Sequence, residues 1–175
     1  SLCYQIPALM RDGVGIIISP LIALMKDQVD NLNEMGIKAR ALNSSLPFNE
    51  VLEVQRELRE GKLDLLYVAP EKLANPSFFS LLKTLNIALF AIDEAHCISE
   101  WGHDFRPSYL QLGVLKEDFP EVPMIALTAT ADKQTRKEIL DKLKIPEKNL
   151  FLSSFDRPNI SYEIVEKKKP KEQLL

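Results

Sequence analysis

Short apolar runs alternate with amphipathic segments along most of the chain. The runs at 14–18, 64–69, 87–92 and 124–127 show little polar alternation, which predicts strands buried on both faces, as in a parallel sheet. Over 21–35, apolar residues recur at helical spacing before Gly36, which we expect to end that helix. Strands that alternate with helices predict an α/β fold, an open parallel sheet with helices on both faces.

The other elements follow from the same kind of pattern. Further helices are predicted over 2–10 (short, buried and bent near Pro7), 48–60 (ended by Gly61), 77–85 and 108–117, and from an Asp132 cap to about Leu143 before Pro146. Further strands are predicted over 38–42 and 150–153. From about residue 155 the composition becomes polar and basic, so we expect one domain over 1–153 and a linker over 154–175 toward a second domain.

Composition limits the classes of protein that the chain could represent. It has 175 residues, 46% hydrophobic and 27% charged, with a formal net charge of −3, as in ordinary globular domains. Contacts with phosphates would therefore need a local basic patch. Cys3 and Cys97 are far apart and lack metal-site spacing, which favours reduced thiols in a cytosolic protein. We expect neither a membrane span nor a signal peptide, and both ends suggest a piece of a longer polypeptide.

Four of the predicted strands end in short polar signatures. These are Ser19-Pro20, Pro70-Glu71, Asp93-Glu94 and Thr128. In open parallel sheets, ligands bind at the carboxyl ends of the strands. We therefore expect a functional crevice at that edge, with Asp93 and Glu94 near its centre.

The acid pair and the segment after it suggest different kinds of chemistry. Adjacent carboxylates at the end of a buried strand suit phosphoryl transfer, one holding Mg²⁺ and the other orienting water. The alternative is a plain surface turn, but the apolar strand before the pair and the Ala-His after it argue against that. Trp101, His103, Phe105, Arg106 and Tyr109 then crowd into nine residues. Nucleic-acid bases stack on aromatic faces, and arginine pairs with phosphates.

These segments resemble the motifs of one enzyme family. Asp93-Glu94-Ala95-His96 is similar to a Walker B motif of the DEAH type, and with 97–109 it resembles the aromatic-rich loop of RecQ DNA helicases, in superfamily 2. Residues 19–28, 66–73 and 126–131 are similar to motifs Ia, Ib and III, and 154–159 to the entry into a second RecA-like lobe. The resemblance implies a RecA-like motor lobe of an ATP-dependent 3′-to-5′ helicase of recombination and repair, cytoplasmic in a bacterium or nuclear in a eukaryote. ATP and Mg²⁺ would be its cofactors, and single-stranded DNA and duplex junctions its partners.

The resemblance also implies roles for single residues. Asp93 would bind Mg²⁺, Glu94 would activate the hydrolytic water, and His96 would couple the nucleotide state to DNA. The residues that sense single-stranded DNA and relay it to the ATP site would be Trp101, His103, Phe105 and Arg106. Thr128 and Thr130 would link this loop to the acid pair, and Ser19, Lys26 and Gln28 would contact the DNA backbone. The alternative for Lys26 is a solvated helix residue.

One part of the motor has no counterpart in the chain. Ser1 would be the last residue of the Walker A motif, with its hydroxyl on Mg²⁺. The glycine-rich turn, its lysine and the strand before them are absent from the sequence, as are the adenine-reading motif and the second lobe with its arginine finger. Because the triphosphate would have no cradle, we expect the chain alone to be catalytically inactive.

Two other readings remain open. The chain could be a non-catalytic single-stranded nucleic-acid-binding module that uses 97–109 and the basic cluster 166–171, although the negative net charge argues against tight binding. Lys167, Lys168 and Lys169 would otherwise form a solvated linker face. A zinc site of His96, Cys97 and His103 would offer only three ligands, whereas structural zinc normally takes four.

Overall fold

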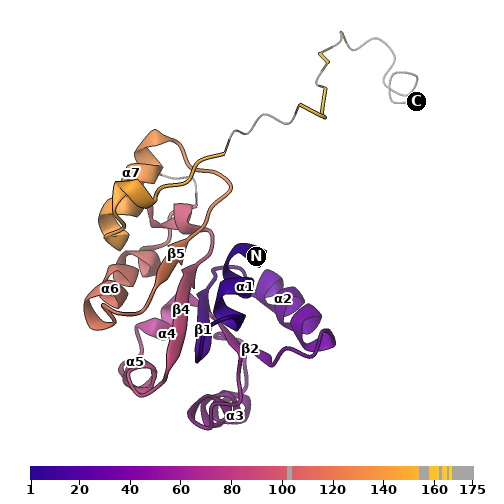
Figure 1. The fold of residues 1–175 in the computed structure, drawn as a ribbon, viewed down its shortest axis with the longest axis vertical. Helices are drawn as coiled ribbons and strands as arrows, with labels where there is room; N and C mark the ends of the chain where they lie inside the picture. Colours follow the sequence, from indigo (N-terminus) through magenta and orange to yellow (C-terminus); the bar gives the residue numbers. More distant parts are fainter. Residues whose placement is uncertain (102–103, 154–157, 162, 165, 167–175) are drawn as a thin grey trace.

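The fold is built on a five-stranded, all-parallel sheet (Figure 1). The structure is a computed structural model that describes residues 1–101, 104–153, 158–161, 163–164 and 166. In sheet order, the strands are β2 (Ala39–Leu42), β3 (Leu65–Val68), β1 (Val14–Ile18), β4 (Ile87–Ile92) and β5 (Met124–Ala126). The predicted α/β parallel sheet is thereby confirmed.

The central strands are apolar because both faces of the sheet are covered. Every residue of β1, β3 and β4 is buried, as their uninterrupted apolar runs predict. Gly15 lies where α1 crosses β1, and a Cβ there would lie 2.7 Å from both Ala8 Cβ and Leu65 Cδ2. A glycine at this position therefore allows close packing of the helix on the sheet.

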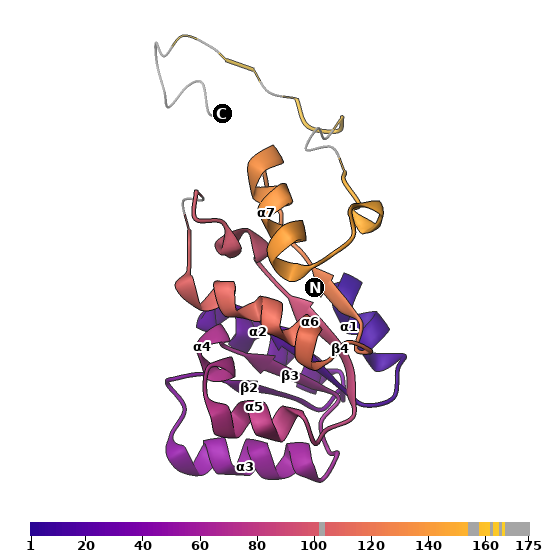
Figure 2. The same ribbon diagram turned by 90° about the vertical axis from the view of Figure 1, so that its left-hand side faces the viewer.

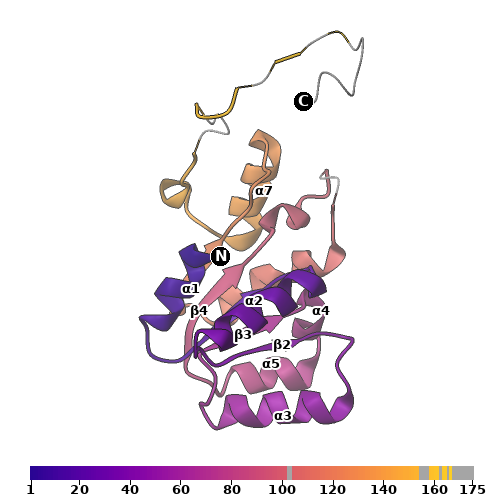
Figure 3. The same cartoon turned by 90° about the vertical axis from the view of Figure 1, so that its right-hand side faces the viewer.

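Helices cover both faces of the sheet. Their bounds are α1 (Leu2–Leu9), α2 (Ile22–Glu34), α3 (Phe48–Arg59), α4 (Pro70–Leu73), α5 (Pro76–Leu82), α6 (Val114–Asp118) and α7 (Lys133–Leu143), with 3₁₀ helices over Ala95–Ile98, Pro107–Gly113 and Glu147–Asn149. Figure 3 shows α1 and α2 on one side of the sheet, and Figure 2 shows α5 and α6 on the other. Two buried clusters correspond to these faces. No helix in the described part of the chain is long and apolar enough to cross a membrane.

Several sequence predictions need correction. Helix α1 is not buried throughout, because only the face with Tyr4, Gln5 and Ala8 meets the sheet, and Leu2 is 66% exposed. The predicted helix over 108–117 is a 3₁₀ helix followed by the short α6, and α4 was not predicted. Strand β5 is half-buried, because it is the last strand of the sheet on its side among the described residues.

The predicted strand over 150–153 is wrong for this structure. The segment has no regular secondary structure, and Phe151 is 91% exposed. An apolar pattern cannot form a strand unless a neighbouring strand supplies hydrogen bonds. The Asp132 cap is confirmed, since its carboxylate accepts a bond from Thr135 N–H at 2.7 Å. The predicted linker over 154–175 lies mostly outside the described residues, and of its basic cluster 166–171 only residue 166 is described.

Candidate ATP and nucleic-acid site

The polar signatures meet at one edge of the sheet, as predicted from the parallel order. Backbone bonds tie the strand ends together there. The Asp93 N–H donates to Ile18 O at 2.9 Å, the Ser19 N–H to Val68 O at 3.1 Å, and the Ala95 N–H to Leu127 O at 2.9 Å. The acid pair after β4 therefore lies between the ends of β1 and β5.

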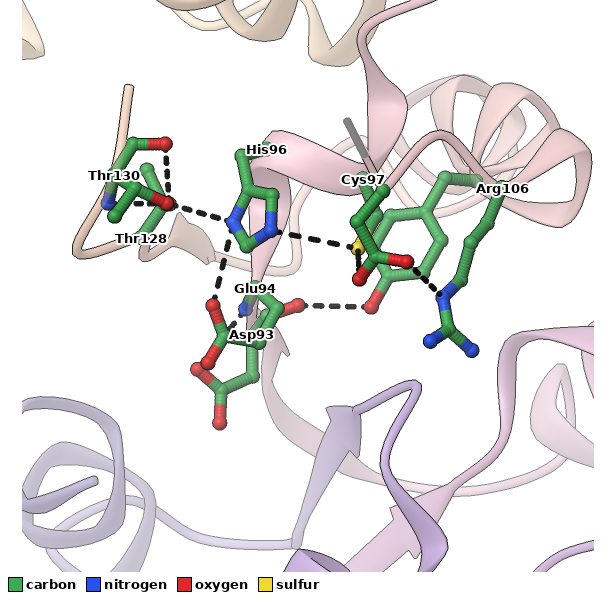
Figure 4. Close-up of polar contacts among 9 residues, drawn as sticks. Asp93, Glu94, His96, Cys97, Arg106, Thr128 and Thr130 are labelled. Atoms are coloured by element: carbon green, nitrogen blue, oxygen red, sulfur yellow. Dashed lines mark hydrogen bonds and ion pairs between the residues drawn. The ribbon is translucent and has the colours of Figure 1, made fainter. Parts of the chain in front are cut away.

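Asp93 is held on three of its oxygens. Its Oδ1 accepts a bond from Glu94 N–H at 3.1 Å (Figure 4). Its Oδ2 accepts one from the Tyr4 hydroxyl at 3.3 Å. Its backbone carbonyl accepts a bond from the Tyr109 hydroxyl at 2.9 Å. Burial is the main cause that raises the pKa values of Tyr4 and Tyr109, so both phenols stay protonated donors at neutral pH.

Glu94 adopts a backbone conformation that is costly for its residue type. Its φ of 49° and ψ of 45° lie in the left-handed region, which costs a residue with a Cβ about 1 kcal/mol. Such strain often occurs at functional sites, where the surrounding structure imposes it. The turn brings Glu94 Oε2 to 3.3 Å from His96 Nδ1.

His96 joins the acid pair to the segment after β5. Its Nδ1 lies 2.9 Å from Thr128 Oγ1, which in turn accepts a bond from Thr130 N–H at 3.2 Å. Because the Glu94 carboxylate can only accept, the network assigns the ring hydrogen to Nδ1. Three residues with separately predicted roles, His96, Thr128 and Thr130, thus come together in one chain of contacts (Figure 4).

The aromatic-rich loop is anchored at its base. Arg106 Nη1 donates to Pro20 O at 3.2 Å, and Arg106 Nε lies 3.5 Å from Asp104 Oδ1. Trp101 is 82% exposed, whereas Phe105 is partly buried. His103 lies outside the described residues.

Comparisons with known proteins agree with this geometry. The family model described as DEAD/DEAH box helicase matches residues 1–139. The chain belongs to the DEAD/DEAH box helicase family. Its sequence is 58% identical over 174 residues to the ATP-dependent DNA helicase RecQ of Pasteurella multocida, and 47% identical over 166 residues to that of Bacillus subtilis. These alignments cover 99% and 94% of the chain but only 28% of each relative, and the predicted resemblance to RecQ helicases is confirmed.

A solved structure supports the fold of this helicase lobe. The helicase domain of Hef from Pyrococcus furiosus aligns with a TM-score of 0.57 at 15% identity, covering 79% of this chain and 28% of that one. At that identity the likeness concerns the fold alone. It agrees with the predicted RecA-like sheet.

The helicase residues that would hold Mg²⁺ present suitable donor atoms. A carboxylate and a hydroxyl are the hard oxygen ligands that Mg²⁺ prefers. Ser1 precedes α1 and its side chain makes no capping bond, while α1 reaches Asp93 through Tyr4. This donor set fits the ion that the family implies.

The motif Ia residues differ in how they are placed. Ser19 is 1% exposed, and its Oγ has no hydrogen-bond partner in the described part of the chain. The side-chain oxygen of Gln28 accepts a bond from Gln5 at 2.8 Å. Of these three residues, only Lys26 is exposed. DNA contact by all three stays a prediction.

A sulfur-containing cluster lies beside the histidine. The ligand atoms of His96, Cys97 and Asp104 all lie within 4.8 Å of one another. However, burial raises the pKa of the Cys97 thiol to about 12, which disfavours the thiolate that zinc binds. The protonated thiol therefore argues against zinc at this cluster, and His103, the third ligand of the predicted zinc site, lies outside the described residues.

Three polar residues that sequence reasoning did not single out lie next to the site. They are Tyr4, Gln5 and Tyr67, which are 1%, 6% and 1% exposed. Each interrupts an otherwise apolar stretch, Tyr4 and Gln5 in 2–10 and Tyr67 in 64–69. That interruption is the signal that could have identified them, because buried polar groups need partners.

An apolar groove of about 540 Å³ runs along the outer edge of β5. Its walls include Ile125 and Leu127 from β5 and the residue after it, Ile139 from α7, and the segment 150–153. Cys3 of α1 lies at the same groove. Apolar side chains on both sides thus flank an edge of the sheet that no described strand covers.

Proposed function

We propose that this chain is most of the first motor lobe of an ATP-dependent 3′-to-5′ DNA helicase of the RecQ family, which couples ATP hydrolysis to unwinding in recombination and repair. One observation carries the proposal. The acid pair contacts both the Thr128 segment, through His96, and the aromatic-rich loop, through Tyr109. A motor needs such a connection between its nucleotide site and its DNA site.

The chain's own residues would divide the hydrolytic work. Bound Mg²⁺ would neutralise charge on the terminal phosphates of ATP. Asp93, with Ser1, would hold the ion. Glu94, fixed in its turn beside His96, would orient the attacking water and accept its proton.

The loop would report DNA to this centre. Trp101, 82% exposed, offers a face on which a base can stack. At the base of the loop, Arg106 holds the end of β1 through Pro20 O, and Tyr109 holds Asp93 O. A displacement of the loop by DNA would therefore shift the acid pair.

The lobe would span 1–153, with 154–175 leading to the second lobe. The groove beside β5 has the position and apolar lining that a further parallel strand requires. We place there the strand that leads into the phosphate loop in relatives. With no phosphate loop or second lobe, the 175-residue chain alone should hydrolyse ATP negligibly.

An ATPase assay tests the proposal. The full-length protein should show ATP hydrolysis stimulated by single-stranded DNA and abolished by Glu94→Gln. A full-length protein with no DNA-stimulated ATPase would contradict the function. If the 175-residue chain alone showed a rate that Glu94→Gln abolishes, its proposed inactivity would be wrong.

The second candidate is a non-catalytic single-stranded nucleic-acid-binding module. The exposure of Trp101 favours some binding without nucleotide. A salt titration distinguishes the two: tight binding by the chain that weakens steeply with salt would favour the module. We expect weak binding, because the net charge is −3.

A further inference from the structure

A line of buried polar side chains runs under α1 from α2 to the acid pair. Gln5 Nε2 donates both of its hydrogens, to Gln28 Oε1 at 2.8 Å and to the Tyr67 hydroxyl at 2.8 Å. The Tyr67 and Tyr4 rings pack edge to face, with their centroids 6.5 Å apart. Tyr4 then donates to Asp93 Oδ2 at 3.3 Å.

The direction of each hydrogen bond follows from the number of hydrogens available. A carboxylate has none to give, so Tyr4 must donate its only hydrogen to Asp93. The Tyr67 oxygen accepts from Gln5. Two directed hydrogen bonds, from Gln5 to Tyr67 and from Tyr4 to the carboxylate, are thus joined through the packed rings of the two tyrosines.

We propose that Gln5, Tyr67 and Tyr4 form a positioning relay that orients the Asp93 carboxylate for Mg²⁺, and that Gln28 anchors this relay to α2. The relay rests on the proposed function for its consequence, since Asp93 is the expected metal ligand. It adds a second connection to the acid pair, from α2, whose Lys26 and Gln28 are predicted to contact DNA, and this connection is independent of the aromatic-rich loop. Hydrogen-bonded partners of metal ligands commonly control metal affinity.

Burial explains why the relay is rigid. Tyr4 and Tyr67 are each 1% exposed and Gln5 is 6% exposed, so water does not compete for their bonds. Breaking one bond leaves a buried polar group unpaired, which is unfavourable. The structure therefore favours keeping the line intact.

Amide NMR spectra of the 175-residue chain test the connection without any activity. Gln28→Leu and Tyr67→Phe should shift the N–H signals of Asp93 and Glu94. Asn31→Leu, an exposed amide on the same helix, is the matched control and should leave them in place. If Gln28→Leu and Tyr67→Phe leave both signals where Asn31→Leu does, the relay is overturned.

Metal dependence in the full-length protein tests the consequence. Tyr4→Phe should raise the half-saturating Mg²⁺ concentration of the ATPase about tenfold, and Mn²⁺ affinity measured by electron paramagnetic resonance should fall by the same factor. Gln5→Glu should act likewise, because a carboxylate would accept a hydrogen bond from the Tyr67 hydroxyl and so reverse the direction of that bond. Unchanged metal affinity in both variants would overturn the positioning role. A wild-type protein without ATPase would instead contradict the proposed function and leave the NMR result to decide the relay.

Discussion

Tyr109 donates its hydroxyl hydrogen to the backbone carbonyl of Asp93, at 2.9 Å and across 16 positions of the sequence. The phenol is fully buried, and the bond joins the far end of the aromatic-rich loop to the first acid of the pair. The contact reaches the backbone of Asp93 and not its carboxylate. It can therefore shift the acid without competing with a metal for its side chain.

Replacing Tyr109 with phenylalanine should affect stability and coupling together. Tyr109→Phe leaves the Asp93 carbonyl without its donor, so the free energy of unfolding should fall by about 1 kcal/mol in a urea titration of the chain. In the full-length protein, DNA stimulation of the ATPase should fall about fivefold, the rate equivalent of that energy. Lost stability with unchanged stimulation would mean that Tyr109 only supports packing.

Replacing Glu94 with glycine should stabilise the fold while abolishing hydrolysis. Glu94→Gly removes the left-handed strain, and the free energy of unfolding should rise by about 1 kcal/mol. Lys144→Gly is the matched control, because Lys144 has a φ of 55° at the end of α7, away from the site. Thermal unfolding should show both variants stabilised, and only Glu94→Gly should lose the full-length ATPase. A destabilised Glu94→Gly would mean that its side-chain contacts outweigh the strain.

Replacing Thr128 with valine should remove the side-chain link between His96 and the segment after β5. Thr128→Val keeps the shape but removes the oxygen that contacts His96 and Thr130. DNA-stimulated kcat of the full-length protein should fall about tenfold, with KM for ATP changed less, because the lost contact orients a catalytic group. Thr84→Val, whose hydroxyl bonds Leu81 O at the end of α5, is the control. A rise in KM alone, with kcat intact, would contradict this role.

Replacing Trp101 with alanine should weaken DNA binding without loss of stability. The side chain is 82% exposed, so its removal costs little packing, whereas one lost base stack should lower single-stranded DNA affinity about tenfold. Fluorescence anisotropy of the full-length protein measures the affinity. Phe48→Ala, a residue 76% exposed on α3, should have no such effect, and equal losses in the two variants would argue against a specific stack.

The two thiols should react at very different rates. Cys3 is exposed and Cys97 is buried, and burial raises the pKa of Cys97 to about 12. Since the thiolate is the reactive form, a thiol reagent at pH 8 should label Cys3 quickly and Cys97 only in denaturant. Cys3→Ser should remove the fast phase. Fast labelling of Cys97 in the folded Cys3→Ser variant would contradict the buried, protonated thiol.

The sequence was most informative where an apolar run had only one possible environment. The strands at Ile16 and Phe90 could be predicted because their uninterrupted apolar neighbours require burial on both faces. The acid pair could be placed beside the other polar signatures because the carboxyl ends of parallel strands lie together. Segment 150–153 misled because a strand depends on a partner that its own residues do not encode.

The polar contacts of the site could be predicted only in part. His96 and Thr128 were expected to act together, and they touch. The line from Gln5 to Asp93 was not predicted, because its residues come from four elements of the fold and no short sequence motif contains them. Ser19 was expected on a surface, yet the packing at the end of β1 buries it.

The edge of β5, which no described strand covers, has a practical consequence for handling the chain. Exposed backbone groups beside apolar side chains are a template on which a second molecule can add its own strand. Phe151, which lines the groove and is 91% exposed, adds to the exposed apolar surface at this edge. Purified at high concentration, the chain should self-associate edge to edge, with a sedimentation coefficient that rises with loading concentration. The same edge that a neighbouring strand would cover therefore favours association of the chain over a stable monomer.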